Sequence, residues 1–137
     1  MSAFFDISAA LDAQLNTMVG APSVAWPNKE FTPVDGTLYV RPTVLMGTVE
    51  RETVGATAKD WYSGIYQVDV FAPVGQGKKE GLEMADTIAD RFKRGTELTY
   101  NGRTVRILGV TYNTAVSGDS FTQTPVTINF YSLTEER

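Results

Sequence analysis

Apolar side chains recur at every third or fourth position near the start of the chain, which is the spacing of one helix face. The face consists of Phe4, Ile7, Leu11, Leu15 and Met18. Gly20 and Pro22 follow, and a proline cannot continue a helix. The pattern therefore predicts an amphipathic helix over residues 2–18.

The same spacing returns over residues 78–94 and predicts a second amphipathic helix. Its apolar stripe comprises Leu82, Ala85, Ile88, Ala89 and Phe92. Gly95 follows, and glycine readily adopts the positive φ that ends many helices. Residues 22–36 are rich in proline, so we expect mostly loop there, with a short extended piece at residues 24–26.

Alternation of apolar and polar side chains predicts strands in three other places. It is clearest over residues 61–72, where Tyr66, Val68 and Val70 share one face. A strand that begins at residue 38 can continue through Pro42 to residue 46 if it lies at a sheet edge, where proline is tolerated. The last strand includes residues 126–131.

The dipeptide Asn101-Gly102 predicts a tight hairpin, because both residues tolerate the positive φ of a type I′ turn. In that register Leu98 lies opposite Val105. Glu97 lies opposite Arg106, which makes a cross-strand pair of opposite charges.

The order of helix, strands, helix, hairpin and strand predicts an α+β fold within a single domain, residues 1–137. We expect two layers: a mostly antiparallel sheet of four to six strands, with both amphipathic helices packed on one face. The other face would carry Tyr39, Arg41, Gln67, Asp69, Phe71, Arg106, Asn129 and Tyr131. Two interpretations of that face stay open: a solvated surface, or the centre of a protein interface, where aromatic residues and arginine are enriched.

The composition limits the kinds of catalytic, metal and binding site that the chain can hold. The 137 residues include no histidine and no cysteine, which excludes Ser-His-Asp, Cys-His and His-metal sites as well as disulfides. The net charge of −4 argues against a protein that binds duplex DNA by neutralising phosphates. No apolar run is long enough to span a membrane, and the first positive side chain, Lys29, comes too late for a signal peptide. We expect no cofactor, no metal and an intracellular product.

Individual motifs add little catalytic chemistry. Gly75-Gln76-Gly77 stands between a strand and a helix but matches neither a dinucleotide fingerprint nor a P-loop, so we expect a flexible turn. The helical acids Glu80, Glu83, Asp86 and Asp90 are expected to form a solvated face. Lys78 and Lys79 lie where the helix dipole disfavours positive charge, which raises the hypothesis that carboxylates of a neighbouring subunit approach them.

Two further features bear on function. The polar segment 47–59 is expected to be a long loop that either orders on a partner or stays flexible. Asp69 lies within a strand, where aspartate is rare. It is expected either to pair locally with Arg41 or Arg106, or to serve an interface. An alternative of another class is a small enzyme or ligand-binding domain that uses Asp69, Tyr66 or Tyr131.

Several runs resemble the phage tail terminator-like family, and the likeness covers nearly the whole chain. They are GIYQVDVF at residues 64–71, PxGxG at 73–77, ADxIAxxF at 85–92 and RGT at 94–96, with WPN at 26–28, FxP at 31–33 and the NG hairpin at 101–102. The resemblance implies a structural protein and not an enzyme. It also implies a homo-hexameric ring at the head-proximal end of the tail tube, which stops tube growth and joins the tail to the head connector.

The partners implied are other copies of the chain, the tail tube protein and the connector or neck protein, with no membrane and no sequence-specific nucleic acid. DNA would pass through the ring, and the location would be the virion tail after assembly in the host cytoplasm. Another neck component is the alternative. The residues expected at an interface, from their own positions in the sequence, are Arg41, Arg51, Glu52, Lys59, Asp69, Lys78, Lys79, Arg106 and Tyr131.

Overall fold

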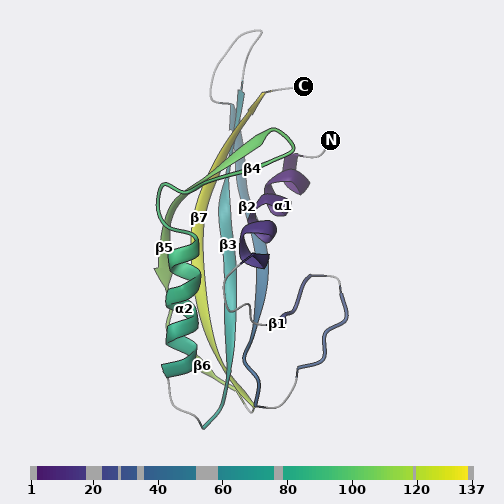
Figure 1. The fold of residues 1–137 in the computed structure, drawn as a ribbon. Helices are drawn as coiled ribbons and strands as arrows, with labels where there is room; N and C mark the ends of the chain where they lie inside the picture. Colours follow the sequence, from purple (N-terminus) through teal and green to yellow (C-terminus); the bar gives the residue numbers. More distant parts are fainter. Residues whose placement is uncertain are drawn as a thin grey trace.

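The computed structural model describes residues 3–17, 23–27, 29–33, 36–51, 59–75, 79–118 and 120–135, with backbone alone at 48, 50, 51, 59–61 and 133–135. Within these ranges two helices and seven strands follow one another (Figure 1). They are α1 (Ala3–Asn16), β1 (Ser23–Val24), β2 (Tyr39–Arg51), β3 (Lys59–Pro73), α2 (Lys79–Arg91), β4 (Glu97–Tyr100), β5 (Arg103–Tyr112), β6 (Val116–Ser117) and β7 (Phe121–Glu135).

The strands form one sheet in the order β1-β2-β3-β7-β5-β4, with the short β6 paired to β7. Every pairing is antiparallel except the two-residue contact of β1 with β2. The predicted α+β class and mostly antiparallel sheet are confirmed, with the two shortest strands bringing the number to seven.

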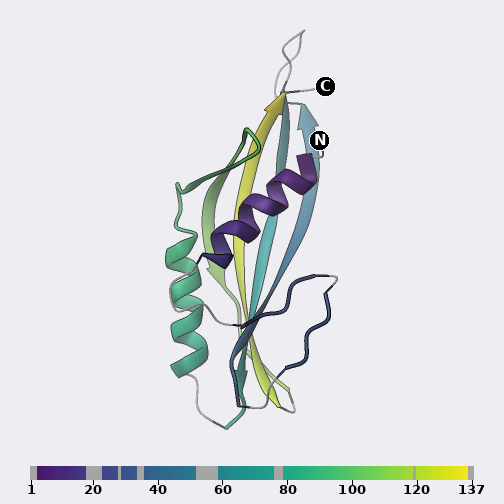
Figure 2. The same cartoon turned by 45° about the vertical axis from the view of Figure 1, so that its right-hand side comes forward.

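Both helices pack on the same face of the sheet, as predicted (Figures 1 and 2). The core between the layers joins Ile7, Leu11 and Leu15 of α1 to Ala85 and Ile88 of α2. On the sheet side, the core includes the buried residues Leu38, Val40, Val68, Val70, Val105, Ile107, Ile128 and Phe130. Within the described ranges, neither helix has the length and apolar character needed to cross a bilayer.

The prediction of a long loop at residues 47–59 is wrong at both ends. β2 continues to Arg51 and β3 begins at Lys59, and the two strands pair beyond a register shift between Met46 and Val49. The physical reason is tertiary pairing, because β7 lies along β3 as far as the contact of Lys59 with Glu135. The ends of these three strands project past both helices (Figure 1). Residues 52–58 lie outside the described part of the chain.

The second helix differs from its prediction in two details. Leu82 was expected in the buried stripe, but its side chain is 44% exposed. Gly81 takes that place against the sheet, because a Cβ there would already lie 3.4 Å from the Cβ of Ala72. The helix ends at Arg91, three residues early, and Gly95 has the expected positive φ of 88°.

The predicted hairpin is confirmed in type and register. Asn101 and Gly102 have φ values of 53° and 83°, and Leu98 pairs with Val105. Glu97 lies opposite Arg106, with an ion pair of 2.7 Å between their side chains.

Candidate functional site

An ion pair buried at the start of α1 holds the β4–β5 hairpin against the helix. Arg103 Nε donates to Asp6 Oδ2 at 2.8 Å, and the Asp6 side chain is 1% exposed. Asn101 Nδ2 donates a longer hydrogen bond of 3.5 Å to the other oxygen of Asp6. These contacts connect residues more than ninety positions apart, so Asp6 fixes the turn of the hairpin in space.

The last turns of the two helices are tied together in the same way. Gln14 Nε2 donates to the carbonyl of Arg91 at 2.8 Å, and Arg91 Nε donates to the carbonyl of Gln14 at 3.1 Å. Arg91 also donates to the hydroxyl of Thr17. Each helix thus satisfies a free carbonyl near the end of the other, which sets the angle between them.

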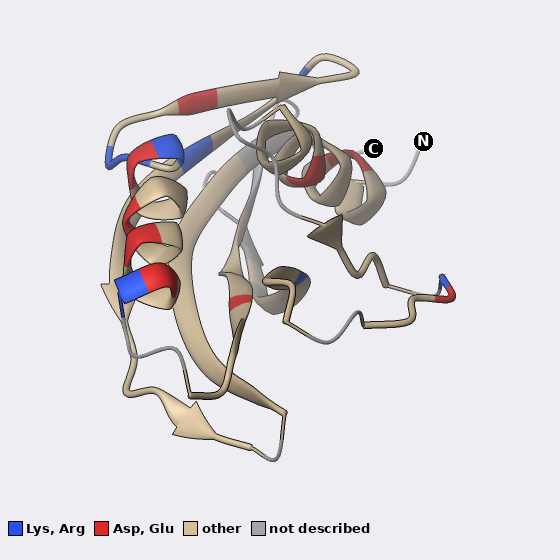
Figure 3. Cartoon of the chain, turned by 60° about the horizontal axis from the view of Figure 1, so that its bottom comes forward, with Lys and Arg blue, Asp and Glu red and all other residues tan. Residues whose placement is uncertain are grey.

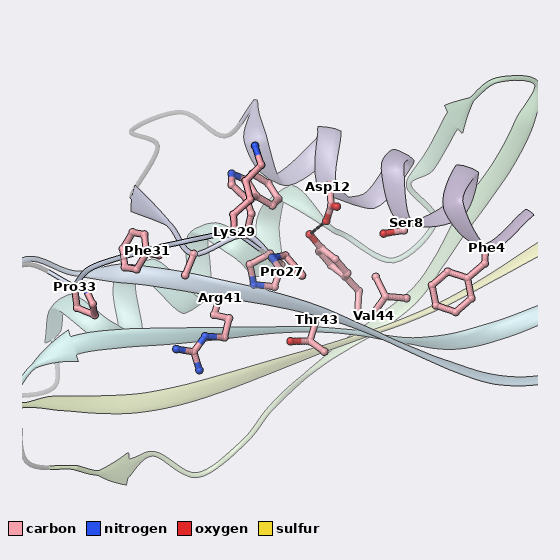
Figure 4. A pocket seen from close by; sticks show the side chains of 14 residues that line it. Phe4, Ser8, Asp12, Pro27, Lys29, Phe31, Pro33, Arg41, Thr43 and Val44 are labelled. Carbon is pink, nitrogen blue, oxygen red and sulfur yellow. Dashed lines mark hydrogen bonds between the residues drawn. The ribbon is translucent and has the colours of Figure 1, made fainter. Parts of the chain in front are cut away.

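A cavity of about 530 Å³ opens at the outer edge of β2 (Figure 4). We call it the edge groove. It lies between α1, the segments 25–27 and 29–33, and the edge strand. Its lining consists of Phe4, Ser8, Asp12, Ala25, Trp26, Pro27, Lys29, Phe31, Pro33, Arg41, Pro42, Thr43, Val44 and Tyr66.

The polar floor of the edge groove is a hydrogen bond between Tyr66 and Asp12. The hydroxyl of Tyr66 donates to Asp12 Oδ1 at 2.7 Å. Burial raises the pKa of Tyr66, and the neighbouring carboxylate raises it further. Burial also raises the pKa of Asp12, an effect that the hydrogen bond from Tyr66 partly offsets. The raised pKa keeps the Tyr66 hydroxyl protonated, so it acts as the donor of this hydrogen bond.

The face of the sheet away from the helices, which we call the outer face, carries an aromatic cluster. The ring of Tyr39 stacks on Phe71 at 4.7 Å and meets the rings of Phe31 and Phe121 at 5.0 and 5.2 Å. The guanidinium of Arg41 lies 5.0 Å from the centre of the Phe71 ring. The chain therefore covers part of this face with its own residues, which neither interpretation from sequence had anticipated.

Asp69 lies on the outer face but is only 6% exposed. It stands directly opposite Arg41 in the pairing of β2 with β3. Its carboxylate accepts a hydrogen bond of 2.9 Å from Gln67 Nε2, while the guanidinium of Arg41 lies over Phe71. The structure thus brings together the two residues expected to pair, but the hydrogen-bond donor to Asp69 is an amide.

Charged residues gather along α2 (Figure 3). Glu80, Glu83, Asp86 and Asp90 are all exposed, as expected for a solvated helix face. Lys79 is exposed at the first position of the helix. No cluster of acidic side chains in the described residues has the geometry to hold a metal ion.

The other predicted interface residues are scattered. Arg106 is exposed and paired with Glu97, and Tyr131 is half-buried on the neighbouring strand. Arg51 and Lys59 close the described ends of the β2–β3 hairpin, where the backbone alone is described. Glu52 and Lys78 lie outside the described residues. Their role in an interface stays a prediction.

Sequence reasoning missed the three contacts that organise this side of the molecule: Asp6 with Arg103, Gln14 with Arg91, and Asp12 with Tyr66. Each partner lies more than fifty residues away, and no local pattern signals such a contact.

Comparison with known proteins identifies a family and two similar structures. The family model for the phage tail terminator protein matches residues 6–130. One solved chain is 24% identical, covers 100% of this chain and 99% of its own length, and has a TM-score of 0.75.

A chain from the virion of a native gene transfer agent particle is 17% identical, covers 98% of both chains and has a TM-score of 0.56. These two structures share the fold. No curated protein matches. Because the family model spans most of the sequence, the chain belongs to the phage tail terminator family, a family of structural proteins of the bacteriophage tail.

Proposed function

We propose that this protein forms a closed homo-hexameric ring at the head-proximal end of the tail tube. There it stops the addition of tube subunits and presents its other side to the head connector. The observation that carries the proposal is the family match over residues 6–130. Its work is then assembly and not catalysis, carried out in the host cytoplasm before the virion is complete.

The charge of the chain supports a ring through which DNA slides. A net charge of −4 and the exposed acids of α2 disfavour contact with phosphates, since like charges repel. Tight binding of the assembled ring to duplex DNA at physiological salt would contradict this part of the proposal.

Contact with a neighbouring subunit is most easily tested at the first turn of α2. Lys79 is exposed at the positive end of the helix dipole, and carboxylates of another subunit would offset that unfavourable placement. Reversing Lys78 and Lys79 to glutamate should lower the assembled mass measured by light scattering. Reversing Lys93 and Arg94 at the other end changes the net charge equally and should leave the mass unchanged.

The capping activity is tested by growing tubes from purified tail tube protein with increasing amounts of this protein. We expect the mean tube length, measured by electron microscopy, to fall as the ratio of terminator to tube protein rises. Lengths that do not respond would contradict capping. A ring that leaves tube length unchanged but binds the connector would instead be another neck component.

A further inference from the structure

The outer edge of β2 is paired for only two residues. β1 covers Tyr39 and Val40, and the last bond runs from the backbone N–H of Ala25 to the carbonyl of Val40 at 2.8 Å. Among the described residues, no strand pairs with this edge from Arg41 onward. A strand edge with free backbone groups is a ready template for another chain.

The backbone groups that face outward can be identified from that bond. Successive residues of a strand direct their backbone N–H and C=O groups toward opposite edges. The backbone groups of Val40 point outward, toward β1, so those of Pro42, Val44 and Met46 point outward as well. Pro42 loses no bond to β3 there, which explains how a proline fits within β2. Val44 and Met46 each offer an N–H and a carbonyl, before the register shift interrupts the strand.

The edge groove surrounds this unpaired stretch from both sides of the sheet. Arg41 and Thr43 point to one side of β2, while Val44 and the α1 residues Ser8 and Asp12 lie on the other (Figure 4). A compact ligand would meet one side alone. An extended chain in the plane of the sheet, with side chains that alternate between faces, contacts both sides and the backbone at once.

The lining also indicates which side chains fit. Apolar surface comes from Trp26, Phe31 and Phe4, the last 48% exposed on a helix face that should be buried. The charged groups at the opening are the exposed cations Lys29 and Arg41, whereas Asp12 is held by Tyr66. A positive opening in a chain of net charge −4 favours an acidic partner.

We propose that the edge groove binds an extended acidic segment of another protein, which joins the sheet as a strand beside β2 where β1 leaves off. Apolar side chains of the segment enter the groove on the side of α1, and a carboxylate on the other side of the segment lies at Arg41. The inference does not depend on ring formation or on capping.

The test uses the full chain, labelled with ¹⁵N, and the peptide acetyl-Thr-Val-Glu-Val-Thr-amide as the probe. We expect backbone amide shifts to concentrate at Val44 and Met46, with slower hydrogen exchange at both. Two analogues locate the bound backbone: one N-methylated at the second and fourth peptide residues, the other at the third alone. Since only one set of peptide N–H groups faces β2, one analogue should bind as the parent does. The other should lose about tenfold in affinity.

Matched variants test the charge. Arg41→Glu should weaken binding of the peptide by about fivefold, and Lys93→Glu, which changes the net charge equally outside the groove, should not. Shifts spread over the surface, or equal binding of both N-methylated peptides, would overturn the proposal. So would protection of Val44 and Met46 that grows with protein concentration in the absence of peptide, because the occupant would then be a second copy of this chain.

Discussion

Tyr66 joins the two layers of the molecule through a single hydroxyl. Its ring is fully buried in the core, and its hydroxyl reaches Asp12 on α1 at 2.7 Å. A buried polar group is costly when it has no partner, so each of these residues depends on the other. The pair therefore fixes where α1 lies over β3.

Replacing Tyr66 with phenylalanine should lower the free energy of unfolding by about 1–3 kcal/mol, because Asp12 loses its donor in a half-buried place. Urea unfolding measures the change. Tyr112→Phe is the matched control, since the hydroxyl of Tyr112 donates to the exposed Asp86. Its cost should be below about 0.5 kcal/mol. Equal losses in the two variants would argue against a structural role for the buried hydroxyl.

The pKa of Asp12 predicts a pH dependence of known sign. Burial raises it, so the folded state holds the proton more tightly than the unfolded state does. The contribution of Asp12 to stability is then largest at low pH, and it falls as the pH rises from the unfolded value of 3.8 through the raised folded value. Asp12→Asn removes that loss and can still accept the hydrogen bond of Tyr66.

The stability of Asp12→Asn relative to the natural chain should therefore increase with pH between about 3.5 and 7. Paired urea titrations at several pH values measure the difference. A difference that decreases with pH would mean that the folded protein lowers the pKa of this carboxyl.

Asp6 and Glu97 each pair with an arginine, but only Asp6 is buried. Asp6→Ala should cost about 3–5 kcal/mol, because it leaves Arg103 without a partner at a side chain that is 13% exposed. Glu97→Ala removes a pair whose side chains are 50% and 56% exposed, and should cost less than about 1 kcal/mol. Thermal unfolding compares the two, and similar melting temperatures would contradict the assigned difference.

At the scale of elements, the strands β2, β3 and β7 pass one another so closely at Gly64 that a side chain does not fit. A Cβ there would lie 2.6 Å from the carbonyl oxygen of Leu45 and 3.1 Å from the ring of Phe130. Gly64→Ala should destabilise the protein by about 1–3 kcal/mol. Gly109→Ala is the control, since a Cβ there meets no atom within 4 Å and should be neutral or slightly stabilising. Denaturant unfolding tests this difference, and the midpoint of Gly64→Ala should be lower than that of Gly109→Ala.

Elements whose cause is local could be predicted from the sequence. The Asn101-Gly102 turn carries its own conformational preference, and the alternation in residues 61–72 identifies the strand and its buried face. The length of β2 could not be predicted, because residues 47–51 are strand through pairing with β3, itself paired to β7. Likewise, Gly81 and not Leu82 packs against the sheet because Ala72 lies close to it, and no local pattern reveals that contact.

The edge groove was beyond sequence reasoning for the same reason. Its parts come from α1, the segments 25–27 and 29–33, β2 and Tyr66, and no local pattern brings them together. Pro42 gave the one hint of this region, because a proline within a strand requires that the strand lie at a sheet edge. The pairing of β2 meets that requirement.

At the scale of the whole molecule, the family match spans residues 6–130 and identifies a structural protein of the phage tail. The hydrogen bonds of Asp6 with Arg103 and of Asp12 with Tyr66 hold α1 in place within this fold. The central claim is that this protein occupies one end of a tail tube. The most direct measurement is cryo-electron microscopy of tubes grown in its presence, with the protein marked by a bound antibody fragment. The account predicts the label at one end of each tube, on a ring of six subunits. Label along the tube wall, or at neither end, would contradict it.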